Sequence, residues 1–208
     1  MDKLISGVKA IATKTSKSSI APEDWESEVN QFVRDIRREA LRIIDPSGSP
    51  EQKEAAITNL GYLSYTGGHA AASSVSTFLP HILSAIKDPR SPHMLVIAAL
   101  RSLSLVCMRS RGAKDLLNKD PDTLKELLNC AADVADFSQS RWACYTIVLC
   151  ITDHPGLMNT LRDLEGCDEK LSKAADASRP WTGWGANMAE LALKMLAIRD
   201  PSEEVAFI

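Results

Sequence analysis

Apolar residues recur along this chain at the spacing of one face of an α-helix. The clearest stripe starts after Pro22 and ends before Asp45-Pro46. Proline suits the first turn of a helix, where its missing N–H would have no partner, and it stops a helix elsewhere. The pattern therefore predicts a long first helix over residues 22–44. Its apolar members are Trp25, Val29, Phe32, Val33, Ile36, Ala40, Ile43 and Ile44.

The same helical pattern continues beyond this first helix. No stretch alternates polar with β-branched residues over the length of a strand, and aromatic residues make up only 5% of the chain. Helices are therefore favoured over strands. Proline and glycine gather in clusters where proline blocks helix continuation and aspartate or serine can cap the next helix. We expect an all-α protein with corners at residues 45–50, 88–92, 120–121 and 154–156.

Two families of helices repeat with a common period. The pattern Ala-x-x-x-Leu/Ile-x-x-apolar begins at Ala56, Ala99, Ala143 and Ala189, at intervals of 43, 44 and 46 residues. Between these segments lie Ile82, Leu127 and Leu171, at intervals of 45 and 44 residues. A small residue at the first position lets a neighbouring helix approach closely, and the later apolar positions continue the same face. Each unit then has an apolar face that only its neighbour can cover.

The repeated segments resemble helices of armadillo repeats. Residues 51–64, 93–107, 139–152 and 185–198 are similar to the last, groove-lining helix of that family. The stretches between them, such as 112–117 followed by 124–128, are similar to its short first and longer second helices. The resemblance covers about residues 51–198, and the period is typical of helical repeats. It implies a right-handed solenoid of four repeats behind the long N-terminal helix, and a role in protein binding.

The chain divides into three parts on this interpretation. Residues 1–20 form a flexible or weakly amphipathic N-terminal arm, residues 21–199 the armadillo-like domain and residues 200–208 a C-terminal tail. Lysines and spaced apolar residues give residues 1–14 a weak membrane-surface character, although a docked or frayed arm is the commoner meaning. The apolar Phe207-Ile208 can be read as a peptide that adds to a sheet edge or as a docked tail.

Charge and composition limit the classes of partner. The 24 basic and 27 acidic residues nearly cancel, whereas a protein that holds a phosphate backbone usually carries a clustered basic excess. We therefore expect no nucleic-acid partner. No apolar run approaches the roughly 20 residues that span a bilayer, and the first residues lack the apolar core of a secretory signal. We expect no transmembrane segment.

The cysteines indicate a reducing compartment. They form an odd set without Cys-x-x-Cys spacing, and most of them fall inside helical patterns. Such residues behave as small buried hydrophobes of an intracellular protein. We expect a cytoplasmic location and free, buried thiols. The five cysteines are Cys107, Cys130, Cys144, Cys150 and Cys167.

The groove positions of the resemblance carry the main functional prediction. Armadillo proteins that bind extended peptides have an asparagine two positions after the central leucine and a tryptophan two positions before it. The asparagine positions here are Tyr62, Leu105, Leu149 and Met195, and the tryptophan positions are Thr58, Arg101, Tyr145 and Leu191. Apolar side chains cannot satisfy the N–H and C=O groups of a bound strand. We therefore expect an apolar helix as ligand, with packing of these side chains on one another or on the N-terminal arm as the alternative.

Two further segments have both a functional and a structural interpretation. Trp181 and Trp184 lie among glycines before the last helix, so they are either anchors for a partner or residues that fold back to cover the end of the solenoid. Arg34, Arg38 and Arg42, with Arg37 beside them, form a basic stripe. The stripe could dock an acidic partner, but pairing with nearby carboxylates in a solvated face is the commoner meaning.

The sequence contains few residue patterns that are typical of catalytic or metal-binding sites. Asp153 and His154 near Cys150 are compatible with a nucleophile and its base, but their place before Pro155 predicts a surface loop. The histidines are widely separated and form no ligand motif, so we expect neither metal nor cofactor. The sequence predicts a non-enzymatic adaptor or scaffold that binds a helical or apolar segment of another protein. The alternatives are a subunit that self-associates through the solenoid ends and an all-helical enzyme.

Overall fold

The computed structural model describes residues 22–133, 135–176 and 181–197, with side chains from residue 31 onward. Every regular element in these ranges is a helix, as the hydrophobic pattern predicts. The expected arm (1–20) and tail (200–208, with Phe207-Ile208) lie outside the described residues. The helices are α2 (Pro22–Ile44), α3 (Pro50–Thr66), α4 (Gly68–Ser76), α5 (Leu79–Lys87), α6 (His93–Arg109), α7 (Arg111–Asn118), α8 (Pro121–Ala132), α9 (Phe137–Ile151), α10 (Pro155–Arg162), α11 (Cys167–Ala175) and α12 (Met188–Met195).

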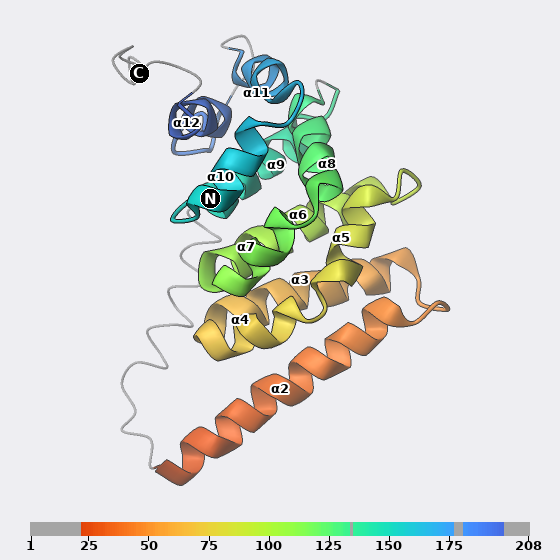
Figure 1. The fold of residues 1–208 in the computed structure, drawn as a ribbon. Helices are drawn as coiled ribbons and strands as arrows, with labels where there is room; N and C mark the ends of the chain where they lie inside the picture. The colour runs from red at the N-terminus through yellow and green to blue at the C-terminus, as the bar shows by residue number, and fades with distance from the viewer. Residues whose placement is uncertain (1–21, 134, 177–180, 198–208) are drawn as a thin grey trace.

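The helices stack in three rows that run along the molecule. Successive members of each row pack against one another: α3, α6, α9 and α12 form one row, α5, α8 and α11 the second, and α4, α7 and α10 the third. Figure 1 shows the stack running from α2 at one end to α11 and α12 at the other. Three units of two short helices and one final helix therefore follow the pair α2 and α3. The repeated helical architecture expected from the two interleaved families is confirmed.

The recurring small residues lie buried on the helices of one row. Ala56, Ala99, Ala143 and Ala189 are all 0% exposed, one on each helix of the α3–α6–α9–α12 row. A methyl group on Gly61 of α3 would fall 2.8 Å from the Cα atom of Ser102 on α6. Real Cβ atoms do not come so close to a backbone atom, so α3 and α6 can pack in this way only with glycine at position 61.

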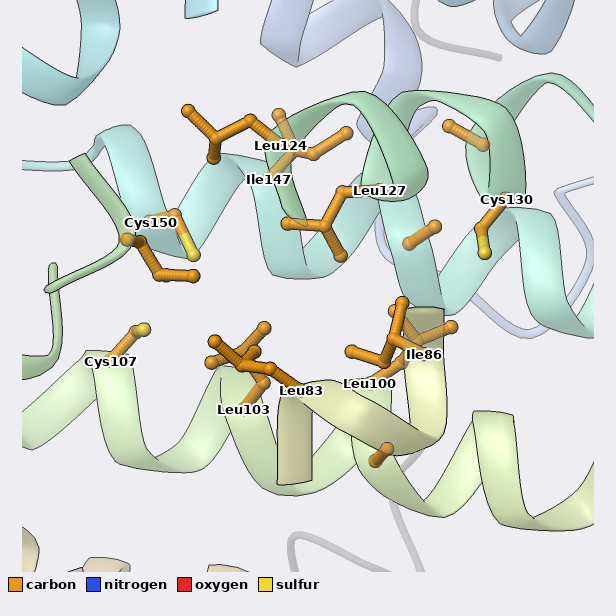
Figure 2. Close-up of a cluster of buried hydrophobic side chains, with 14 of the residues drawn as sticks. Leu83, Ile86, Leu100, Leu103, Cys107, Leu124, Leu127, Cys130, Ile147 and Cys150 are labelled. Carbon is orange, nitrogen blue, oxygen red and sulfur yellow. The ribbon is translucent and has the colours of Figure 1, made fainter. Parts of the chain in front are cut away.

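A continuous core lies between the rows. Figure 2 shows Leu83 of α5, Leu103 of α6 and Leu127 of α8 among the side chains that meet there. Leu103 and Leu127 are both 0% exposed. Complete burial of a leucine side chain stabilises a fold by about 1.5–3 kcal/mol. The four helices α5, α6, α8 and α9 are therefore held together through side chains that no single repeat could bury alone.

The five cysteines are free and buried, as predicted. Burial, with nearby carboxylates, raises the pKa of Cys130 to about 12, and burial raises the pKa of Cys167 to about 11. A hydrogen bond with Cys150 on α9 and burial together raise the pKa of Cys107 on α6. All three thiols stay protonated at neutral pH because their thiolates would lose hydration. They contribute to the core as small apolar groups.

Helix boundaries follow the chemistry of the corners. Ser49 Oγ accepts the N–H of Gln52, and the Gln52 side chain accepts the N–H of Ser49, so this corner starts α3 with a capping box. Asp120 and Asp136 accept N–H groups at the starts of α8 and α9. All four predicted corners lie at junctions between helices, and in three of them the proline is the first residue of the next helix: Pro50 of α3, Pro121 of α8 and Pro155 of α10. The break between α4 and α5 at residues 77–78 was not predicted, because Thr77-Phe78 contains neither proline nor glycine.

Substitution of Gly61 by alanine tests the close approach of α3 and α6. The added methyl group would push Ser102 away, so we expect Gly61→Ala to lower the free energy of unfolding by about 1–3 kcal/mol. Gly112→Ala on α7 is the matched control, since its Cβ would meet nothing closer than 3.7 Å. Alanine should there raise the free energy of unfolding by up to about 1 kcal/mol. Urea denaturation measures both; equal effects of the two substitutions would contradict the packing described.

Candidate protein-binding face

The four helices α3, α6, α9 and α12 share one side whose side chains are only partly buried. We call it the row face. The central apolar residues Leu60, Leu103 and Leu193 are 0% exposed, whereas the positions two residues later keep part of their surface. These later positions are Tyr62, Leu105, Leu149 and Met195. The helical register used in the sequence analysis thus separates a packed side of each helix from a partly exposed side.

Four aromatic rings meet on the row face at α9. We call Trp142, Tyr145, Trp181 and Trp184 the aromatic cluster. The Trp142 and Trp184 ring centroids lie 5.1 Å apart, the Tyr145 and Trp184 centroids 5.8 Å and the Trp181 and Trp184 centroids 6.0 Å, all edge to face. Edge-to-face contacts of this kind contribute about 0.5–1.5 kcal/mol each beyond burial. Residues from α9 and from the α11–α12 loop therefore form one rigid surface.

The described part of the segment before α12 brings Trp184 onto α9 and Trp181 against Trp184. The Trp184 N–H donates to the Trp181 carbonyl at 3.0 Å, and Gly183 between them has φ +83°, a value that glycine adopts without strain. Asn187 then caps α12 and donates from its side chain to the Ala175 carbonyl at 3.0 Å. The two tryptophans therefore fold back against the molecule, and both rings remain partly exposed.

Two arginines lie over aromatic rings of the row face. The Arg101 guanidinium carbon is 5.1 Å from the centroid of Trp142, and that of Arg109 is 4.9 Å from the centroid of Tyr65. Such cation–π contacts hold a positive charge flat on an apolar surface. Arg101 on α6 thereby extends the aromatic cluster of α9 toward the neighbouring helix.

The pKa of Tyr145 depends both on burial and on a neighbouring side chain of α3. Burial of the hydroxyl raises the pKa of Tyr145, and Tyr65 on α3 adds to the rise. The two phenols interact although α6 lies between their helices in the row. This arrangement brings side chains of α3, α6 and α9 toward one another on the same face.

The structure brings together four residues that the sequence analysis singled out separately. Tyr145, Trp181 and Trp184 belong to the aromatic cluster, and Arg101 lies over its Trp142 ring. Tyr62, Leu105, Leu149 and Met195 lie on the same row of helices, outside the four rings of the cluster. The sequence analysis missed Trp142, Tyr65 and Arg109. Helical spacing points to them, because Trp142 precedes Tyr145 by three residues, Tyr65 follows Tyr62 by three and Arg109 follows Leu105 by four.

The predicted surface loop is confirmed for Asp153, which is exposed in the turn before α10, but it is wrong for His154. It is 5% exposed and caps α10. Its Nδ1 accepts the N–H of Leu157 at 2.9 Å, and its Nε2 lies 2.9 Å from Asp115 Oδ1. This hydrogen bond lowers the pKa of Asp115. Both ring nitrogens thus have protein partners.

The described part of the chain has few features of a metal site or of a membrane-spanning segment. Within residues 31–133, 135–176 and 181–197, no group of three or more His, Cys, Asp or Glu side chains could hold a metal ion. Taken singly, no helix in the part of the chain that the structure describes has the length and apolarity to cross a membrane. Only α6 and α7 together reach that length and composition, and they are bent by 118°.

Titration of Tyr145 tests the burial of the cluster. Because burial favours the neutral phenol, the folded state loses stability as the pH rises from the unfolded tyrosine pKa, near 10, through the raised folded pKa. In the folded wild type, we expect part of the rise in phenolate absorbance to occur at a higher pH than for an ordinary tyrosine. This late part should be absent from Tyr145→Phe. In guanidinium the late part should return to the ordinary range. An unchanged late part in Tyr145→Phe would contradict the assignment.

Comparison with known families agrees with this architecture. The family model of Armadillo-like helical domain-containing protein 2 matches residues 40–198. Comparisons with curated proteins and with solved structures give no match. The matched segment includes α3 to α12 entire, with the end of α2, and spans well over half of the 208 residues. The chain therefore belongs to the Armadillo-like helical domain-containing protein 2 family.

Proposed function

We propose that this chain is a non-enzymatic adaptor or scaffold that binds a helical, apolar segment of another protein along the row face. The row face would be the concave side of a right-handed solenoid. Armadillo-like helical domains commonly mediate protein interactions. The observation that carries the proposal is the joining of Arg101, Tyr145 and Trp184 into one surface around Trp142. Tryptophan, tyrosine and arginine are the residues most enriched where partners bind tightly.

The chemistry of the row face favours a helix over an extended strand. The positions that hold a peptide backbone in related grooves are here Tyr62, Leu105, Leu149 and Met195. Three of these side chains cannot hydrogen-bond to a strand, but all four can receive apolar anchors spaced at i, i+3 and i+7 on a helix. Arg101 and Arg109 carry positive charge beside them, so carboxylates flanking the anchors would add to the affinity.

The proposed location is the cytoplasm. The five free, buried thiols fit a compartment that keeps cysteines reduced.

Charge placed on the row face tests the proposal. Leu105→Asp and Leu149→Asp would set a carboxylate in the path of an apolar anchor, and we expect each to reduce partner recovery at least tenfold. Leu116→Asp on α7 is the matched control, since Leu116 is 44% exposed and belongs to another row. Affinity purification from cells with quantitative mass spectrometry measures recovery. Circular dichroism must first show that all three variants fold.

Full recovery of every partner by folded Leu105→Asp and Leu149→Asp would sink the assignment of the row face. If Leu116→Asp reduced partner recovery to the same extent, the assignment of the row face would also be contradicted, because the effect would then not be local.

A further inference from the structure

α2 exposes three large apolar residues, of which Leu41 lies among the arginines of its outer side. Val33 is 48% exposed, Leu41 60% and Ile44 44%. α2 packs on α3 and α4 and ends the stack (Figure 1), so its other side meets no helix of the described chain. Terminal units of solenoids usually carry a polar outer face. An end helix with three exposed aliphatic side chains is therefore a candidate surface for association.

The arginines of this surface are held in place from below. Glu39 is 2% exposed and lies under the helix, where it pairs with Arg38 at 3.1 Å and Arg42 at 2.9 Å and accepts a hydrogen bond from Asn59 at 3.4 Å. One buried carboxylate thus orients two guanidiniums whose side chains remain 64% and 44% exposed. The predicted salt pairing is present, but it leaves the arginines at the surface.

A shallow hollow of about 500 Å³ opens on this side of α2. Four of its six lining residues are positive and one is negative, with an exposed leucine among them. The lining consists of Arg34, Arg37, Arg38, Leu41, Arg42 and Asp45. A segment that fits this hollow must supply carboxylates together with apolar side chains.

The two ends of the chain differ in how well they meet this requirement. Residues 1–20 contain four lysines and one aspartate, so they carry the same sign of charge as the hollow. Residues 200–208 contain Asp200, Glu203 and Glu204, no basic residue, and then the apolar run Val205-Ala206-Phe207-Ile208. Of these two segments, residues 200–208 combine the acidic and apolar side chains that the arginines and Leu41 can receive.

Geometry places this contact between two molecules. From α2 to α12 the packing runs through α3, α6 and α9, which at roughly 8–10 Å per helix pair amounts to about 35 Å. Residues 198–208 would span about 37 Å only if fully extended, which leaves almost no length to lie along α2. We propose that residues 200–208 of one copy dock on the outer side of α2 of a second copy. The contact is head to tail, so it joins different surfaces of the two copies.

Charge reversal in the full-length chain tests the proposal. We expect the apparent mass of the wild type in sedimentation experiments to rise with protein concentration and to fall with added salt. Arg34→Glu/Arg37→Glu and Glu203→Lys/Glu204→Lys should each remain monomeric alone, whereas a mixture of the two should associate. In the mixture, the intact tail of the first variant meets the intact α2 of the second. Arg111→Glu/Lys119→Glu, at the first residue and the C-cap of α7, makes the same change of charge elsewhere and should behave as wild type.

Several outcomes would overturn the proposal. A wild-type chain that stays monomeric at all concentrations excludes the contact between copies. This holds also if the tail binds α2 of its own molecule, because that contact would give a monomer. Association that survives either double reversal, or that the α7 control also abolishes, excludes these surfaces. Failure of the mixture to associate, with both variants folded by circular dichroism, excludes the head-to-tail pairing. These readouts do not depend on the row face, so they stand apart from the proposed adaptor function.

Discussion

The backbones of α3 and α6 approach so closely that a methyl group on Gly61 would lie 2.8 Å from the Cα atom of Ser102. Small residues recur at buried positions along the row, where Ala99, Ala143 and Ala189 are 0% exposed. Dispersion forces fall steeply with distance, so close backbones allow the leucines beside them to interlock. Each repeat leaves an apolar face that only its neighbour covers, and close packing of the row makes that covering effective.

Packing on one side of each row helix sets what its other side can do. The fully buried Leu103 fixes the rotation of α6, and this rotation leaves Arg101 and Leu105 at the row face. The same logic places Tyr145 beside the buried Ile147 on α9. The α11–α12 loop then adds Trp184 to Tyr145 and Trp142. A surface rich in rings and guanidiniums thus results from helices whose orientation the core has already determined.

Much of the fold could be predicted because it depends on periodic burial. The spacing of Ala56, Ala99, Ala143 and Ala189 identified the row helices, and proline and aspartate marked most of the corners. The break at Thr77-Phe78 carries no such residue, so the separation of α4 from α5 was missed. The aromatic cluster was harder to predict from the sequence, because the contact of Trp184 with Trp142 joins residues 42 positions apart and depends on the turn at Gly183. His154 was misjudged since its partner Asp115 comes from a different repeat.

The proposed function requires that the apolar helix of a partner protein contacts the row face and not the α7 side of the molecule. Photo-crosslinking in cells tests it most directly, with a photoreactive phenylalanine analogue in place of Leu149 on α9 or of Leu116 on α7. If the partner binds the row face, the analogue at position 149 forms a discrete crosslinked band with another protein and the analogue at position 116 does not. A discrete band from position 116 with none from position 149 would contradict it.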